Sequence, residues 1–224
     1  PDLATSLSNL GNRLAQAGRR NEALTAEQEA VQIRRQFAAD NPAAFEPDLA
    51  RSLSNLGNRL AQAGRRNEAL TASEEAVQIY HRLAADNPAA FEPDLARSLS
   101  NLGIRLSEAG RRNEALTATE EAVEIRRRLA ADNPAAFEPD LATSLCVLAM
   151  ALAGEGKLLK ALRVTDEALE RYRRYVGTLP STFSQLHAAL GLQALLLDSV
   201  GRQQEAEAVR QWLRENPLRP DADS

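Results

Sequence analysis

The fold is decided by residues 47–92, which read PDLARSLSNLGNRLAQAGRRNEALTASEEAVQIYHRLAADNPAAFE. Nearly the same text precedes this stretch from Pro1 and follows it from Pro93, and a more divergent copy begins at Pro139. The starts at residues 1, 47, 93 and 139 give a period of 46 residues. A fixed period in this range is typical of a repeat array, in which each unit packs against its neighbours.

Four repeats and a closing segment account for the whole chain, and we expect them to form one continuous solenoid domain. The repeats span residues 1–46, 47–92, 93–138 and 139–180, a closing helix pair spans 181–215, and a tail spans 216–224. The closing pair departs from the repeat text, as the end units of solenoids usually do because one of their faces meets water.

Apolar residues recur within each repeat at helical spacing. In the first repeat the intervals alternate between four and three residues, which predicts one face of a helix. The residues are Leu3, Leu7, Leu10, Leu14 and Ala17. A similar pattern from Ala23 predicts a second helix, and no segment reads as a strand. The predicted fold class is therefore all-α, an α-solenoid of stacked antiparallel helix pairs.

Turn-forming residues mark the expected helix ends. Gly18 is expected to end the first helix in a left-handed cap. We expect the second helix to open near Asn21 as its N-cap and to stop before Asn41, because the residue before Pro42 avoids the helical region. Pro47 then fits the first position of the next helix. Each repeat is thus predicted to hold two helices of roughly 17 to 20 residues.

The repeat text resembles that of tetratricopeptide repeats. The family spacing places a large residue, then Leu-Gly, another large residue, and an Ala twelve residues after the Gly. Here these residues are Leu7, Leu10, Gly11, Leu14 and Ala23, with their counterparts in the next two repeats. The run DLATSLSNLG at 2–11 is most similar to members of kinesin light chain type. The resemblance implies a right-handed superhelix with a concave groove lined by the first helix of each repeat.

The chain departs from the family pattern in its aromatic residues and its period. The aromatic residue that the family places four positions after Ala23 is replaced by Glu27, and by Ser73 or Thr119 in the next repeats. The period of 46 residues also exceeds the usual ~34 residues. The extra residues fall around the text AADNPAAFEPD.

Composition excludes several classes of protein. The net charge of −4 gives no support for general attraction to nucleic acid or to a membrane surface. The longest mostly apolar run, residues 145–153, is too short to span a bilayer. We therefore expect neither nucleic acid nor a membrane as a partner, and we expect a cytoplasmic location.

Residues that commonly carry catalysis or bind metals are scarce. The two histidines, His81 and His187, have no Cys, Asp or Glu at the helical spacing of metal ligands. Cys146 stands where other repeats have Ser and has no identifiable base, which favours a small packed thiol over a nucleophile. We therefore expect no enzymatic activity, no metal site and no cofactor.

An arginine pair follows the first helix of each of the first three repeats. One interpretation is a basic rim that contacts phosphate or acidic peptide. The interpretation that we favour is structural, because such arginines offset the negative end of the helix dipole and can pair with Glu22, Glu68 and Glu114.

The polar face of the first helices is the candidate binding site, since the family resemblance places these positions in the groove. An Asn side chain both donates and accepts, so a ladder of them can hold an extended peptide backbone. The alternative is that the asparagines only bridge helices. Apolar residues towards the C-terminal end are expected to accept a hydrophobic anchor. The candidate groove residues are Asn9, Asn12, Arg51, Asn55, Asn58, Arg97, Asn101, Ile104, Val147 and Met150.

The sequence therefore predicts a non-enzymatic module that binds a peptide or protein segment in the concave groove. The alternative function is a structural spacer, or a self-association or sensor segment of a larger multidomain regulatory protein. Self-association would then use the uncapped N-terminal end, within residues 1–20.

Overall fold

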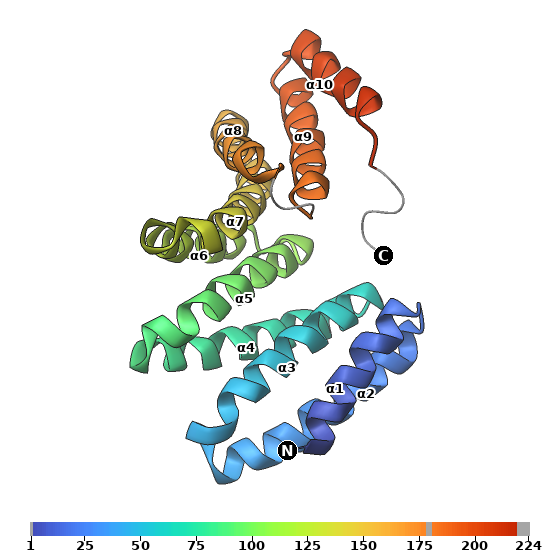
Figure 1. Cartoon of the computed structure of the whole chain (residues 1–224), viewed down its shortest axis with the longest axis vertical. Coiled ribbons are helices and arrows are strands. Elements are labelled where there is room, and N and C mark those ends of the chain that lie inside the picture. The colour runs from blue at the N-terminus through green and yellow to red at the C-terminus, as the bar shows by residue number, and fades with distance from the viewer. Residues whose placement is uncertain (1, 178–180, 219–224) are drawn as a thin grey trace. The chain divides into compact units, whose positions relative to one another are not determined.

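The computed structural model describes residues 2–177 and 181–218 (Figure 1). These residues form ten α-helices and contain no strand, which confirms the predicted all-α class. The helices are α1 (Asp2–Gln16), α2 (Arg20–Asp40), α3 (Pro42–Gln62), α4 (Arg66–Asp86), α5 (Pro88–Glu108), α6 (Arg112–Asp132), α7 (Pro134–Gly154), α8 (Leu158–Tyr175), α9 (Ser181–Ser199) and α10 (Gln203–Glu215).

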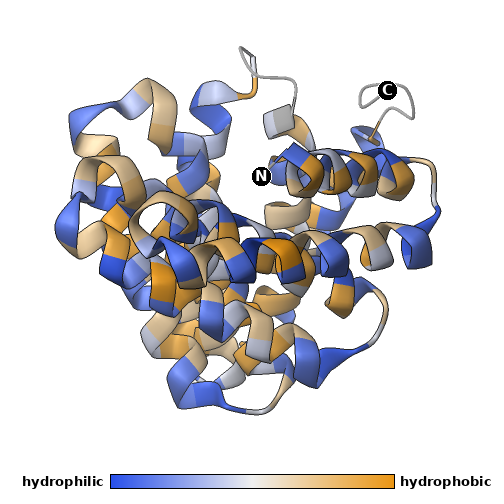
Figure 2. Ribbon diagram, turned by 90° about the horizontal axis from the view of Figure 1, so that it is seen from below, coloured by the Kyte–Doolittle hydropathy of each residue, from blue (hydrophilic) through white to orange (hydrophobic). Residues whose placement is uncertain are grey.

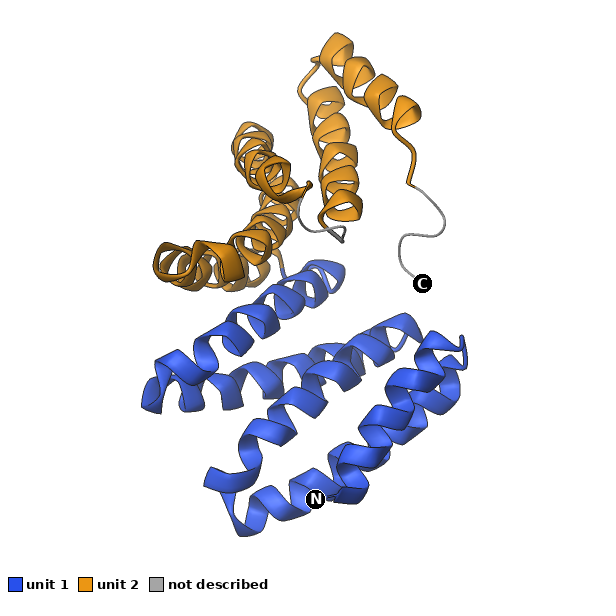
Figure 3. Cartoon of the chain, in the orientation of Figure 1, with its two compact units in different colours: residues 1–111 blue, residues 112–224 orange. Residues whose placement is uncertain are grey.

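The helices pack in chain order within two compact units (Figure 3). Unit 1 covers residues 1–111 and contains α1 to α5, and unit 2 covers residues 112–224 and contains α6 to α10. Odd-numbered helices are the first helices of the sequence repeats, and even-numbered helices are the second. Along the helices, hydrophilic residues alternate with hydrophobic ones, as expected for helices that bury one side (Figure 2).

A glycine in the left-handed region ends every first helix. Gly18 has φ of 74°, and its four counterparts have φ between 73° and 80°. The amide of Arg19 donates to the carbonyl of Leu14 at 2.8 Å, and the amide of Gly18 donates to that of Ala15 at 3.0 Å. This is the Schellman motif, so the expected left-handed cap is confirmed.

Glycine inside the first helix permits close approach of the second. A Cβ atom on Gly57 would lie 2.7 Å from Oγ of Ser73 and 3.3 Å from the carbonyl oxygen of Ala69. A Cβ on Gly11 would lie 3.2 Å from the carbonyl oxygen of Ala23. Glycine therefore allows the two helix backbones to approach closely at these two positions.

The long period lengthens the helices rather than the loops. Both α2 and α3 have 21 residues, and only Asn41 separates them. Oδ1 of Asn41 accepts from the amide of Ala44 at 3.3 Å, so Asn41 caps α3. The rings of Phe37 and Phe45 pack at this corner with centroids 5.2 Å apart.

Two predicted helix starts are wrong. Pro47 lies inside α3 rather than at its first position, because Asn41 caps the helix and Pro42 takes the first turn. At its internal position Pro47 removes the bond to the carbonyl of Ala43 only. Asn21 is likewise not an N-cap, because α2 already begins at Arg20, directly after the Schellman turn.

One helix, α7, is long and apolar enough to cross a membrane by length and composition. Half of its most apolar window is buried, and it packs against α6, α8 and α9 within unit 2. Its leucines and alanines belong to the core cluster of that unit, together with Leu169 and Tyr172 of α8. An apolar composition of this kind is also typical of a helix in a protein core, and α7 contributes to the core of unit 2.

Candidate functional site

The first helices α1 and α3 of unit 1 border a surface depression of about 410 Å³. Five of its seven lining residues carry a side-chain amide, and no lining residue is acidic. The lining residues are Asn12, Ala15, Gln16, Asn55, Asn58, Arg59 and Gln62. Three of the predicted groove asparagines therefore lie together, and the depression is rich in groups that both donate and accept hydrogen bonds.

Two of these asparagines are held by arginines from the next first helix. Nη2 of Arg59 donates to Oδ1 of Asn12 at 2.7 Å, and Nη2 of Arg105 donates to Oδ1 of Asn58 at 3.4 Å. Asn12 and Asn58 therefore bridge first helices, while their NH₂ groups remain available as donors. Sequence reasoning missed both arginines, although an Arg directly follows position 12 in each of the first three repeats.

Asn55 differs from its two neighbours because its side-chain amide makes no hydrogen bond within the described residues. It is half-buried in the wall of the depression. Asn101 is half-buried on α5, and Asn9 is exposed on α1. Asn55 is thus the half-buried amide of the depression that is free to bind a ligand, beside the exposed amides of Gln16 and Gln62.

The two candidate arginines of the groove are engaged in local ion pairs. Arg51 pairs with Asp48 and Arg97 pairs with Asp94, each one helical turn away. All four side chains keep much of their surface exposed. Because the carboxylates offset the charge of the guanidinium groups, a ligand carboxylate would compete with an aspartate for each arginine.

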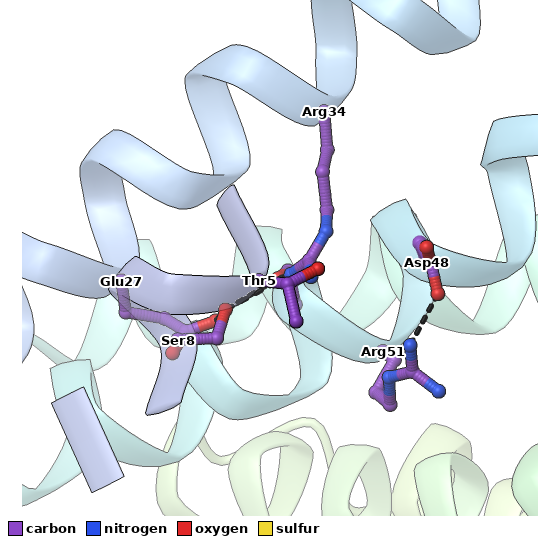
Figure 4. Close-up of polar contacts among 7 residues, drawn as sticks. Thr5, Ser8, Glu27, Arg34, Asp48 and Arg51 are labelled. Atoms are coloured by element: carbon purple, nitrogen blue, oxygen red, sulfur yellow. Dashed lines mark hydrogen bonds and ion pairs between the residues drawn. The ribbon is translucent and has the colours of Figure 1, made fainter. Parts of the chain in front are cut away.

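A buried polar cluster lies beneath this surface, between α1, α2 and α3 (Figure 4). Nη1 of Arg34 donates to Oγ of Ser8 at 2.9 Å and also bonds Ser52. Oγ of Ser8 donates to Oε1 of the fully buried Glu27 at 3.2 Å. Burial lowers the pKa of the Arg34 guanidinium. Ser8 therefore links the first two repeats from inside.

The apolar groove candidates lie in different surroundings. Ile104 is half-buried on α5, at the position that Asn12 and Asn58 have in the earlier repeats. In unit 2, Val147 is 8% exposed and belongs to the core, whereas Met150 is 47% exposed. Of the two residues on α7, Met150 therefore offers the larger surface to a ligand.

The Cys146 thiol is partly buried, and the first arginines of two of the Arg pairs form ion pairs. Burial raises the pKa of the Cys146 thiol to about 11, so this thiol stays protonated at neutral pH. Arg19 pairs with Glu22 and Arg65 with Glu68, as the structural interpretation of the arginine pairs requires. Across residues 2–177 and 181–218, no group of three His, Cys, Asp or Glu side chains is arranged to hold a metal ion.

Family models of the tetratricopeptide repeat match residues 3–36 and 48–128, which together make just over half of the chain. The chain belongs to the tetratricopeptide repeat family. Members of this family generally mediate protein–protein interactions. No curated protein sequence matches the chain.

Solved structures of tetratricopeptide repeat proteins share the fold. The putative kinesin light chain of Podosopora anserina, with nearly identical repeats, has a TM-score of 0.69 and 22% identity over 94% of this chain and 93% of its own. BtubC (BKLC) of P. vanneervenii has a TM-score of 0.71 and 20% identity over 100% of this chain and 85% of its own.

A third similar structure contains a bound peptide. It is the Rap conjugation gene regulator of plasmid pLS20 in complex with the Phr* peptide, with a TM-score of 0.62 and 17% identity over 92% of this chain and 52% of its own. Because the identities are 22% or lower, these similarities concern the fold alone. The fold of the kinesin light chain agrees with the resemblance that the repeat sequence shows.

Proposed function

We propose that this chain is a non-enzymatic interaction module that holds a peptide or protein segment on the face formed by α1, α3 and α5. The observation that carries the proposal is the depression lined by five side-chain amides, in which the amide of Asn55 is free. A half-buried amide without a partner forgoes hydrogen bonds that an extended peptide backbone can supply through its N–H and C=O groups.

The charges on this face favour recognition of backbone over recognition of a charged motif. Arg51 and Arg97 are neutralised by Asp48 and Asp94, and the guanidinium of Arg59 is occupied by Asn12. The remaining polar groups are neutral amides, which bind a peptide with little dependence on its side chains. A peptide in the structure of the similar Rap regulator supports this class of ligand.

The proposal assigns no catalytic role to Cys146, His81 or His187. The Cys146 thiol has a raised pKa, and thiols react as thiolates. His81 is exposed on α4, and His187 packs beside the ring of Phe183 on α9. None of these side chains lies in the amide-lined depression.

The test uses peptides selected on the immobilised chain from a random dodecapeptide library. The affinity of each selected peptide is then measured by fluorescence anisotropy for the wild-type chain and for Asn55→Ala. Loss of a bidentate amide contact is expected to weaken binding about tenfold. Circular dichroism should remain helical, because the side chain of Asn55 makes no hydrogen bond within the described residues that a truncation would break.

The matched control is Asn67→Ala. Asn67 is exposed and lines a different depression, between α2, α3 and α4. Asn67→Ala should not change the affinity of peptides that bind on the amide-lined face. The proposal is rejected if the selected peptides bind Asn55→Ala as tightly as the wild-type chain. It is also rejected if Asn67→Ala lowers their affinity as much as Asn55→Ala does.

A further inference from the structure

A largely apolar depression lies in unit 2, where the turn between α7 and α8 meets the residue that follows α9 (Figure 1). Its volume is about 480 Å³, and no lining residue is acidic. Leu159 in its wall is 67% exposed, more than any other large apolar side chain of the described residues. The lining residues are Gly156, Lys157, Leu158, Leu159, Lys160 and Val200.

The sequence of this turn differs from that of every other turn between paired helices. In the other turns an arginine follows the left-handed glycine, and a glutamate stands three residues further on. The fourth repeat has lysine at both positions, Lys157 and Lys160, and these are the only lysines of the chain. Leu159 likewise stands where the first three repeats have asparagine. The arginine and glutamate positions are 19 and 22, 65 and 68, 111 and 114, and 202 and 205.

The other turns offset their own positive charge, and this turn does not. The ion pairs of the other turns are Arg19–Glu22, Arg65–Glu68, Arg111–Glu74 and Arg202–Glu205. Within residues 2–177 and 181–218, Lys157 and Lys160 form no ion pair, not even with the neighbouring Glu155. Two cations at the start of α8 repel each other and oppose the positive end of the helix dipole. An anionic partner would therefore relieve an unfavourable interaction that is particular to this turn.

The exposure of Leu159 does not depend on which unit follows. Its counterparts in the second and third repeats, Asn67 and Asn113, are exposed although the next helix packs on α4 and on α6. In the same way, α9 packs on α8 and leaves Leu159 exposed. The fourth repeat thus places an apolar side chain at a position that is exposed in each repeat and is polar in the others.

We propose that residues 156–160 and Val200, the lysine-flanked depression, bind an acidic segment of a partner protein. A large apolar side chain of that segment packs against Leu159 and Val200, and its carboxylates pair with the two lysines. The charge complementarity favours an acidic partner, and a concave surface suits an inserted side chain better than a flat anionic membrane. None of these residues lines the amide-lined depression of unit 1, so this is a second binding site.

The test uses fluorescein-labelled peptides and the full chain in fluorescence anisotropy. In each peptide one leucine, phenylalanine or methionine is flanked on both sides by two glutamates within a glycine–serine sequence. At least one of them should bind the wild-type chain, and its affinity should fall with added salt because salt screens the attraction of the lysines. The same peptide with glutamine in place of glutamate should bind at least about tenfold more weakly.

Two variants restore the residues that the other turns contain. Lys157→Arg combined with Lys160→Glu recreates the arginine–glutamate pair and should weaken peptide binding about tenfold, because a self-neutralised pair replaces two free cations. Leu159→Asn should weaken binding about fivefold and leave its salt dependence unchanged. Both variants should keep their helical circular dichroism, since the same residue types occupy the same turn elsewhere in the chain.

Matched controls change charge and apolar surface at other places. Arg174→Glu, at the opposite end of α8, alters the net charge as much as the double lysine variant does. Leu3→Asn removes a leucine that is 61% exposed in unit 1. Neither control should change the affinity of the acidic peptide.

Three results would overturn the proposal. The first is that no peptide of the set binds the wild-type chain at millimolar concentration. The second is that a peptide binds the double lysine variant or Leu159→Asn as tightly as the wild-type chain. The third is that the chain binds vesicles of phosphatidylserine and phosphatidylcholine through Leu159 and the two lysines while the acidic peptides fail to compete, because a membrane would then be the partner.

Discussion

Nε of Arg59 on α3 lies 3.7 Å from Oε2 of Glu27 on α2, and the Glu27 carboxylate has no exposed surface. Because Arg34 is also buried, three ionised side chains share the junction between the first two repeats. The position of Glu27 holds Ser73, Thr119 and Thr165 in the later repeats. An ionised cluster of this kind is therefore particular to the first junction and distinguishes it from otherwise similar neighbours.

Removing the carboxylate should destabilise unit 1 strongly. Glu27→Ala leaves Arg59 in a buried site without its counter-charge, whereas Arg34 keeps the attraction of Asp48. Breaking a buried ion pair costs about 3 to 5 kcal/mol. The free energy of unfolding in urea, compared with that of the wild-type chain, measures the effect. A loss below about 1 kcal/mol would show that water or rearranged side chains already neutralise the arginines.

A matched replacement tests whether charge or packing is responsible. The double variant Glu27→Ser with Arg34→Tyr reproduces the pair Ser73 and Tyr80 that the second repeat uses at the same positions. It should recover part of the stability lost in Glu27→Ala, because a packed side chain replaces Arg34 while Arg59 still lacks its counter-charge.

The helix pairs and their glycine turns were predictable because they depend on local spacing. Gly18 needs only its own left-handed conformation. The leucine spacing predicts the buried side of α3, where Leu53 and Leu60 are buried, but on α1 the corresponding stripe includes the exposed Leu10. The role of Glu27 was not predictable, because a carboxylate at a helical position normally faces water. Its burial follows from the tertiary approach of Arg59, whose position in the sequence gives no sign of a partner 32 residues earlier (59 − 27).

The candidate site was predictable in position but not in detail. The periodicity brings Asn12, Asn55 and Asn58 to one depression, as the repeat pattern suggested. The sequence does not distinguish the asparagines that an arginine holds from the free amide of Asn55. That distinction depends on the reach of Arg59 and Arg105 from one repeat to the previous one.

The stability of the protein should fall at alkaline pH because of Tyr80. Burial raises the pKa of its hydroxyl to about 12, with a further contribution from Asp94. The unfolded chain, with a tyrosine pKa of about 10, loses this proton first. Stability is therefore complete below pH ~10 and declines as the pH rises towards 12.

Tyr80→Phe isolates this contribution. The Tyr80 hydroxyl is buried and makes no hydrogen bond, although Arg97 lies nearby. The variant should be as stable as the wild-type chain at pH 7, or up to about 1 kcal/mol more stable, and should show a shallower decline between pH 10 and 12. Urea unfolding of both chains across this range measures the difference. Parallel declines would contradict the assignment to Tyr80.

The Cys146 thiol should react slowly in the folded protein. At pH 8 a thiol with a pKa of about 11 has roughly a hundredfold less thiolate than an unfolded cysteine. Modification by Ellman's reagent should therefore be about a hundredfold slower in buffer than in urea. Equal rates would show that the thiol is neither buried nor protonated as described.

A final prediction follows from the close approach between Gly57 of α3 and Ser73 of α4. A Cβ atom at position 57 would lie 2.7 Å from Oγ of Ser73, so Gly57→Ala forces that hydroxyl to move. We expect a net loss of about 1 to 2 kcal/mol in unfolding free energy, although alanine gains about 1 kcal/mol in helix propensity.

Adding Ser73→Ala to Gly57→Ala removes the clashing oxygen and should restore the stability. The fourth repeat already has Ala149 at the position of Gly57, opposite Thr165, whose hydroxyl donates to the carbonyl of Ala161 at 2.9 Å and so turns away. A double-mutant cycle in urea should therefore give a favourable coupling of at least about 0.5 kcal/mol between positions 57 and 73. Strictly additive effects would show that the cost of Gly57→Ala comes from the carbonyl oxygen of Ala69 instead. This oxygen lies 3.3 Å from the added atom, and no side-chain change can remove it.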